Sequence, residues 1–246
     1  MKVLLITVAG SSTRFSRSLG KDTLKCVYYE KEFRQCLLYQ LIYKSSFDKY
    51  VIVGGYKFDE LTSAIDKYFV DIKEKIILVE NVKFSEYGSG YSLYLGLKSA
   101  IETDFDELVF AEGDLWFDND SFEQVLDHSQ NVITYNNDVI DSHKSVVFYF
   151  DQNNFPHYIY DTNHNHLQIK QPFLSIYNSG QVWKFVDRDR VIDSFDAISE
   201  REWQGTNLVY IQKYYGDMKK DSIALVNFKQ WLNCNTVEDF RKIPEE

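Results

Sequence analysis

Proline and cysteine are scarce in this 246-residue sequence, with three of each. The few prolines and the lack of a linker-like stretch favour one large α/β domain over two small ones. The cysteines, Cys26, Cys36 and Cys234, are widely scattered and lack the paired spacing of a zinc site or a disulfide framework. We therefore expect a reducing, cytoplasmic setting and no thiol chemistry.

Basic residues are also few: the chain has 27 Lys and Arg against 37 Asp and Glu, which gives a formal net charge of -10. A general nucleic-acid binder needs a surplus of basic side chains on one face, so this class is excluded. No run approaches the roughly 18 apolar residues that a transmembrane helix requires. The opening apolar run, residues 1–8, lacks a small-residue cleavage site and is predicted to be a first strand. We expect neither a nucleic acid nor a membrane as a partner.

Short apolar runs alternate with amphipathic stretches in the first half of the chain, a pattern typical of strand–helix–strand units on a mostly parallel sheet. There we predict strands over residues 3–8, 50–53, 75–79 and 107–111 and helices over residues 34–44, 58–69 and 89–101. In the second half we predict strands over residues 145–150, 157–160, 168–177 and 223–226 and helices over residues 180–188, 206–215 and 236–242. The expected fold class is α/β and Rossmann-like, with a mixed, mostly parallel sheet flanked by helices.

A turn of small residues follows the first predicted strand, over residues 9–13. Backbone amides in such a turn are free, and an anion can approach them closely. The basic residues Arg14, Arg17, Lys21 and Lys25 gather beside it in an otherwise acidic protein. This predicts a phosphate site, in which Arg14 offers bidentate hydrogen bonds and Lys25 or Lys21 offers a point charge. The loop has neither a Walker ending nor the Gly-x-Gly-x-x-Gly of a dinucleotide fold.

The segment Ala9-Gly10-Ser11-Ser12-Thr13-Arg14-Phe15, with Lys25 further on, resembles a signature of one enzyme family. That signature, Ala-Gly-x-Gly-Thr/Ser-Arg-hydrophobic…Pro-Lys, belongs to the nucleotidyltransferases that activate sugar phosphates, phosphocholine and related acceptors. The resemblance implies a fold of the nucleotide-diphospho-sugar transferase type. It also implies that residues 9–13 bind the triphosphate and that Arg14 and Lys25 are catalytic. Ser12 stands where Gly is usual and Leu24 where Pro usually precedes the lysine, so either Lys25 or Lys21 is the signature lysine.

Two further segments carry the resemblance through the middle of the chain. The stretch over residues 86–93 is similar to the family's base-recognition loop, which implies that Gly88 and Ser92 bind the nucleotide. Asp114 follows Gly113 directly after a predicted buried strand, where ligands of open α/β sheets usually bind. In the family a Gly-Asp at this point supplies the metal carboxylate, which implies that Asp114 holds Mg²⁺. Each segment taken alone also fits a helix cap or a turn.

The closing segment, residues 231–240, is similar to the family's Trp-x-Asp-Ile-Asp/Asn-Thr-x-Glu-Asp-Leu and implies that Asn235 completes the metal site. Asn occupies both acidic positions of the pattern here, so triphosphate oxygens and water would supply more of the coordination. Lys144, Gln181 and Thr206 resemble acceptor-side elements of the cytidylyltransferase branch. The same residues also fit a surface lysine and helix caps.

The resemblance thus implies a single nucleotidyltransferase domain over residues 1–246, with a nucleotide-binding part over about 1–130 and an acceptor-binding part over about 131–230. The implied reaction joins CMP from CTP to a small phosphorylated acceptor with release of pyrophosphate. Within the family, the Ser92 and Asn235 segments resemble those of capsule-type phosphoglutamine and phosphocholine cytidylyltransferases. The alternatives are a sugar-1-phosphate nucleotidyltransferase using another triphosphate, a glycosyltransferase using a sugar nucleotide, and an inert nucleotide-binding domain.

Overall fold

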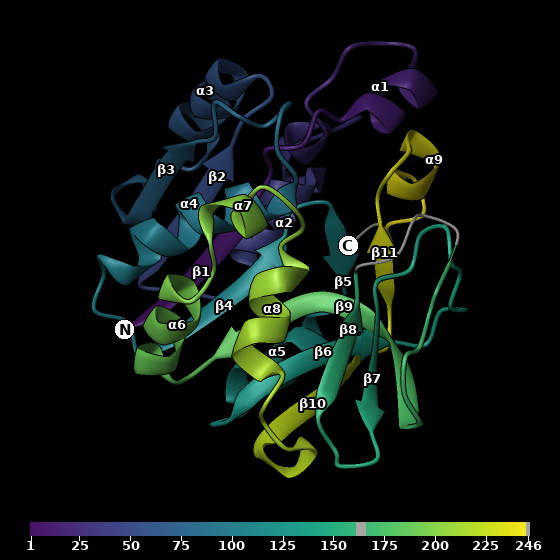
Figure 1. Cartoon of the computed structure of the whole chain (residues 1–246). Coiled ribbons are helices and arrows are strands. Elements are labelled where there is room, and N and C mark those ends of the chain that lie inside the picture. Colours follow the sequence, from purple (N-terminus) through teal and green to yellow (C-terminus); the bar gives the residue numbers. More distant parts are fainter. Residues whose placement is uncertain (161–165, 245–246) are drawn as a thin grey trace.

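A mixed β-sheet lies between two layers of helices in the computed structural model, which describes residues 1–160 and 166–244 (Figure 1). The main sheet runs in the order β10-β6-β9-β4-β1-β2-β3, and β7 and β8 extend it beside β9. Its strands are β1 (Lys2–Thr7), β2 (Lys49–Gly54), β3 (Ile76–Glu80), β4 (Glu107–Glu112), β6 (Asn131–Asn136), β7 (Val147–Asp151), β8 (Pro156–Ile159), β9 (Phe173–Phe185) and β10 (Ile223–Phe228). A second, two-stranded sheet pairs β5 (Leu115–Phe117) with β11 (Trp231–Asn233).

The sheet confirms the predicted fold class. Strands β4, β1, β2 and β3 are parallel neighbours, and β10 is parallel to β6. The exception on this path is β9, which runs antiparallel to both β4 and β6. The long β9 therefore joins the two parallel parts into one sheet.

Helices cover both faces of the sheet. They are α1 (Thr13–Leu19), α2 (Leu37–Tyr43), α3 (Phe58–Tyr68), α4 (Ser89–Ile101), α5 (Asn119–Asp127), α6 (Arg188–Asp196), α7 (Glu200–Trp203), α8 (Leu208–Tyr215) and α9 (Val237–Phe240). Buried side chains place α2, α3 and α5 on one face and α4, α6 and α8 on the other. Within residues 1–160 and 166–244, no helix has the length and apolar character needed to cross a membrane.

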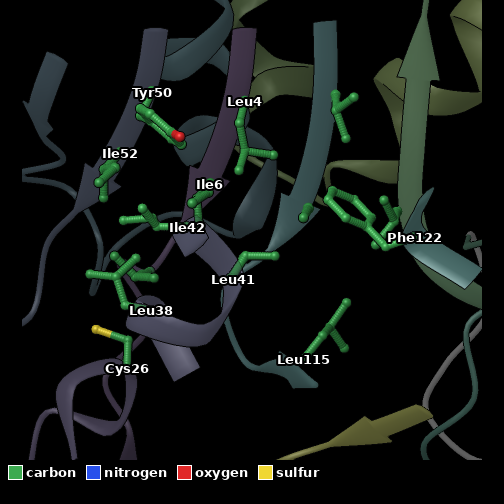
Figure 2. Packing of buried hydrophobic residues seen from close by; sticks show 14 of the residues in the cluster. Leu4, Ile6, Cys26, Leu38, Leu41, Ile42, Tyr50, Ile52, Leu115 and Phe122 are labelled. Carbon is green, nitrogen blue, oxygen red and sulfur yellow. The ribbon is translucent and has the colours of Figure 1, made fainter. Parts of the chain in front are cut away.

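The core follows from the alternation of side chains along the strands. Leu4 and Ile6 of β1 face α2, where Leu38 and Leu41 pack toward them (Figure 2). Val3 and Leu5 of β1 face α4 and contribute to the core on the other side of the sheet. Because both faces are covered, the parallel strands are mostly apolar, as buried parallel strands usually are.

One predicted helix is wrong. Residues 180–185 continue strand β9, and the next helix, α6, begins only at Arg188. This part of the strand lies between β4 and β6. Residues 178–185 are buried on both faces, so they lack the period of two that would distinguish a strand from a helix. Gly180 fits this packing, because a Cβ there would lie 2.6 Å from the Thr134 hydroxyl. The predicted strand over 168–177 likewise begins only at Phe173.

The other predicted elements are present, with their ends shifted by a few residues. Helix α1, which follows β1, and helix α9, near the end of the chain, lie side by side (Figure 1). The rings of Phe15, Tyr28 and Phe240 meet edge to face with centroids 5.1–6.4 Å apart. The amide of Val237 donates to the Ser18 hydroxyl at 2.9 Å. This packing holds the closing segment against the elements that follow β1.

Candidate active site

A cavity of about 400 Å³ opens where β1 and β4 end. Its lining comes from residues 7–12 at the end of β1, Lys25 and Cys26, residues 84, 87–89 and 92 before and within the first turn of α4, and residues 112–114 at the end of β4. Most of the predicted phosphate, base and metal residues contribute to this lining, namely Ala9, Gly10, Ser11, Ser12, Lys25, Gly88, Ser92 and Asp114. Segments that are far apart in the sequence therefore form one site.

The loop after β1 presents open backbone to the cavity. A Cβ added to Gly10 would have no heavy atom within 4 Å, so a ligand can approach the chain there. Ser12 has a left-handed backbone, with φ of 53°, a conformation that favours the glycine usual in the resembling signature. Its hydroxyl accepts the backbone N–H of Lys25 at 3.2 Å, and the Ser11 and Thr13 hydroxyls hydrogen-bond at 2.8 Å. These bonds tie the loop to the lysine.

Lys25 and Asp114 meet inside the cavity. The Lys25 ammonium lies 3.0 Å from Oδ2 of Asp114, and the two side chains are 15% and 28% exposed. The alternative lysine, Lys21, is exposed and does not contribute to the cavity lining. Of the two lysines, Lys25 is the one that the fold brings to the carboxylate.

The other oxygen of Asp114, Oδ1, is buried and has no hydrogen-bond partner among the described residues. A buried acceptor of this kind is costly unless a ligand or ion satisfies it. The backbone carbonyl of Asp114 accepts the N–H of Cys234 at 2.9 Å, which brings the closing segment to this carboxylate. The side-chain amide of Asn235 donates to Oδ1 of Asn233 at 2.9 Å, and Asn235 lies outside the cavity lining.

The segment at the start of α4 is held rigidly. The Ser92 hydroxyl accepts a hydrogen bond of 2.9 Å from the amide of the fully buried Asn81. Gly88 donates its N–H to the carbonyl of Gln204 at 2.8 Å, and a Cβ there would lie 2.3 Å from the carbonyl oxygen of Gly205. Only glycine permits this close approach between the α4 start and the connection before α8.

Glu112 is a cavity residue to which sequence reasoning assigned no role. Its Oε1 accepts a 2.6 Å hydrogen bond from the side-chain amide of the buried Asn207. The backbone N–H of Asn207 in turn donates to the hydroxyl of Ser89 at 3.1 Å. Burial, and then the charge of Asp114, raise the pKa of Glu112 to about 7. The available signal was the position of Glu112 at the end of a buried strand, two residues before the predicted metal carboxylate.

Arg14 and the predicted acceptor residues lie outside the cavity lining. Arg14 is exposed on α1, and Lys144 is exposed in a turn, 4.0 Å from Asp141. Gln181 is buried in β9 with φ of 56°, next to Val182, which is paired with Ala111 of β4. Thr206 precedes α8, and its hydroxyl lies 3.3 Å from Oδ1 of Asn207. Thus Gln181 and Thr206 lie near the Glu112 side of the site, whereas Lys144 is in a surface turn.

All three cysteine thiols are buried. Burial raises the pKa of the Cys26 thiol to about 12 and that of Cys234 to about 12, in each case against the opposing charge of Lys25. A thiol is a poor nucleophile until it ionises. Cys26 therefore lines the cavity as a small apolar group.

Three solved structures that share this fold are described as nucleotidyltransferases. The inositol-1-phosphate CTP transferase from T. maritima is 18% identical over 97% of this chain and 91% of its own, with a TM-score of 0.66. A putative glucose-1-phosphate thymidylyltransferase from Bacillus anthracis is 13% identical over 98% and 93%, with a TM-score of 0.69. The CTP:phosphocholine cytidylyltransferase from Streptococcus pneumoniae is 15% identical over 98% and 97%, with a TM-score of 0.61. At these identities the likeness establishes the fold.

Comparison with curated proteins gives no match. A family model described as "Domain of unknown function (DUF6564)" matches residues 21–246, which is most of the chain. The protein therefore belongs to the DUF6564 family.

Proposed function

We propose that this protein is a magnesium-dependent nucleotidyltransferase that transfers CMP from CTP to a small phosphorylated acceptor. The observation that carries the proposal is the meeting of three groups in one cavity: the open backbone at Gly10, the ammonium of Lys25 and the carboxylate of Asp114. Free backbone amides and a lysine ammonium are ligands for phosphate oxygens. A carboxylate is a ligand that Mg²⁺ prefers.

In the proposed reaction, a phosphate oxygen of the acceptor attacks the α-phosphorus of the triphosphate in line. The new phosphorus–oxygen bond forms as the bond to the bridging oxygen breaks, and pyrophosphate leaves with that electron pair. The product is a diphosphate-linked nucleotide. No protein nucleophile is required, so the protein contributes alignment and the positive charge of Lys25 and Arg14. Arg14 reaches the phosphates in this proposal from its exposed position on α1.

Asp114 and Asn235 are the residues proposed to hold magnesium. The buried, unpartnered Oδ1 of Asp114 fits a cation ligand, and the carbonyl oxygen of the Asn235 side chain remains available because its amide nitrogen makes the bond to Asn233. No group of three His, Cys, Asp or Glu side chains suited to a metal occurs within residues 1–160 and 166–244. The triphosphate and water would then supply the remaining oxygens. When bound, magnesium neutralises part of the charge on the triphosphate and the leaving pyrophosphate.

Two observations support CTP and an acceptor similar to phosphocholine or phosphoglutamine. Two of the three named structural neighbours are described as CTP-using enzymes, acting on inositol-1-phosphate and on phosphocholine. The resemblance of the Ser92 and Asn235 segments to those of capsule-type cytidylyltransferases supports a role in modifying capsule or cell-surface polysaccharide. The thymidylyltransferase among the neighbours supports the second candidate, a sugar-1-phosphate nucleotidyltransferase using another triphosphate.

Single replacements by Ala test the assigned residues through pyrophosphate release with CTP, Mg²⁺ and acceptor. Arg14→Ala, Lys25→Ala and Asp114→Ala should each lower turnover by about 100-fold or more, the size of effect seen when a transition-state charge partner is removed. Lys21→Ala is the matched control and should leave turnover unchanged, because the fold brings Lys25, and not Lys21, to the carboxylate of Asp114. Circular dichroism checks that each variant is folded. Near-normal turnover in the Arg14, Lys25 and Asp114 variants would overturn the assignment.

A further inference from the structure

A buried side-chain amide lies behind the cavity wall at the start of α4. Asn81 directly follows β3, is fully buried and does not contribute to the cavity lining. Its backbone N–H donates to the carbonyl of Gly54, the last residue of β2, at 2.8 Å. Asn81 is therefore fixed to the ends of two strands, and its side chain acts on the cavity only through its neighbours.

A backbone donor sets the orientation of the Asn81 amide. Its Oδ1 accepts the N–H of Lys83 at 2.8 Å, in a turn in which the side chain bonds the backbone two residues further on. A flipped amide would place one N–H donor against another, so this bond decides which end is oxygen. The amide nitrogen, Nδ2, is therefore the atom that meets Ser92, and it donates to the Ser92 hydroxyl at 2.9 Å.

This bond makes the Ser92 hydroxyl an acceptor on its buried side. A serine hydroxyl also has one proton to donate. Within residues 1–160 and 166–244 no acceptor takes that proton, because the bond from Asn81 is the one hydrogen bond of the hydroxyl. Ser92 is 6% exposed and lines the cavity, so a ligand there can receive the proton. A buried donor left unpaired is unfavourable, so the ligand should present an acceptor atom.

The base of the proposed substrate, CTP, can supply this acceptor. The Watson–Crick edge of cytosine has two acceptors, O2 and N3, and proteins that read an unpaired base use hydrogen bonds to this edge. Uracil and thymine share O2, whereas their N3 carries a hydrogen and is a donor. A hydroxyl proton directed at N3 therefore favours cytosine, because with the other two bases it would meet a second proton.

We propose that Asn81 is a positioning residue for base selection, whose amide fixes the Ser92 hydroxyl as a hydrogen-bond donor to N3 of cytosine. Asn81 touches no substrate and acts through Ser92. The inference rests on the proposed use of CTP, and it assigns the residue that sets the polarity of the base site.

Calorimetric binding of CTP, UTP and 3-deazacytidine triphosphate, with Mg²⁺ and without acceptor, tests the proposal. The 3-deaza analogue keeps O2 and the amino group of cytosine but has C–H in place of N3. Wild type should bind CTP about tenfold or more tightly than either of the other two, the range expected when one buried donor loses its acceptor. Ser92→Ala should bind CTP and the 3-deaza analogue with nearly equal affinity.

Two variants of Asn81 change the direction of the bond to Ser92. Asn81→Asp keeps the size of the side chain and the acceptor for Lys83, but places a carboxylate oxygen against the Ser92 hydroxyl. Two hydrogen-bond donors favour the ionised carboxylate, so Ser92 then donates to it and offers a lone pair to the base. At pH 8 the CTP-over-UTP affinity ratio should fall by about tenfold or more. Asn81→Ala frees the hydroxyl to rotate and should lower the ratio by less.

A double-mutant cycle separates this role from a loss of stability. In a Ser92→Ala background, Asn81→Ala should leave the CTP-over-UTP ratio unchanged, because the hydroxyl through which it acts is absent. Asn136→Ala is the matched control, since Asn136 is also buried and its Oδ1 accepts the N–H of Asp138 at 3.0 Å, but it lies on β6 outside the cavity lining. This control should lower the free energy of unfolding and keep the wild-type ratio.

Two results would overturn the positioning role. One is a wild-type ratio in both Asn81→Asp and Asn81→Ala. The other is an equal fall caused by Asn81→Ala with and without the Ser92 hydroxyl. Failure of nucleotidyl transfer is recognised separately, because these binding measurements need no turnover. A preference for CTP that depends on Asn81, without pyrophosphate release with any acceptor, would refute the transfer alone. Pyrophosphate release by a protein that binds CTP and the 3-deaza analogue equally would refute the positioning role alone.

Discussion

Ser12 offers a quantitative test of how the loop positions Lys25. Its left-handed backbone costs a non-glycine residue about 1–2 kcal/mol, and its hydroxyl accepts the Lys25 amide at 3.2 Å. Ser12→Ala keeps the backbone cost and loses the hydrogen bond, which should lower the free energy of unfolding by about 1 kcal/mol. For a chain of this size that corresponds to a fall of about 2–4 °C in Tm.

Ser12→Gly loses the same hydrogen bond but removes the cost of the left-handed backbone. The greater freedom of glycine in the unfolded chain lowers the stability of the folded protein by about 0.5–1 kcal/mol. The free energy of unfolding of Ser12→Gly should therefore stay within about 1 kcal/mol of that of wild type. Thermal unfolding of the three proteins measures the order of stability, in which Ser12→Gly should exceed Ser12→Ala. Both variants should bind triphosphate several-fold more weakly by calorimetry, because both release the backbone of Lys25. A Ser12→Ala protein as stable as wild type, or more stable than Ser12→Gly, would refute this reasoning.

Three other predictions concern the metal, the thiols and the core. Asp114→Asn should lower Mg²⁺-dependent turnover by about 100-fold or more, and an unaltered rate over a Mg²⁺ titration would argue against a metal on this carboxylate. All three cysteines are buried, and the pKa of Cys26 and of Cys234 is raised to about 12, so Ellman's reagent at pH 8 should label the native protein only slowly and label all three thiols in denaturant; rapid labelling of the native protein would contradict this. A Cβ at Gly96 would lie 2.3 Å from a side chain of β1, so Gly96→Ala should lower the free energy of unfolding in urea by about 1–3 kcal/mol. The exposed Lys98→Ala on the same helix should change it by less than about 0.5 kcal/mol, and equal stability of these two variants would contradict the packing argument.

The parallel half of the fold was predictable because its signals are local. Each strand from β1 to β4 is a short apolar run, and α3 and α4 show helical spacing between such runs. Residues 180–185 of β9 were predicted as a helix, because a strand segment buried on both faces lacks the alternation of apolar and polar side chains. The three-residue strands β5 and β11 pair across more than 100 residues, and nothing in either segment alone indicates that partner.

The candidate site also combines features that are local in the sequence with contacts that only the fold creates. Small residues after β1 and a carboxylate after β4 are local features, so the loop and Asp114 were predictable from the sequence. The contact between Glu112 and Asn207 joins residues 95 positions apart and depends on how α8 packs on the sheet. The sequence assigned no role to Glu112, because the burial that raises its pKa arises only from tertiary packing. Arg14 and Lys144 are charged and near matching motifs, but charge alone does not indicate which way a side chain points.

The most direct test of nucleotidyl transfer is a pyrophosphate-release screen. The purified protein is incubated with Mg²⁺, each of the four ribonucleoside triphosphates and a panel of phosphorylated acceptors that includes choline phosphate and sugar 1-phosphates. We predict pyrophosphate formation that requires both substrates and is fastest with CTP. No pyrophosphate from any pair, in a protein that still binds triphosphate by calorimetry, would contradict the proposed activity.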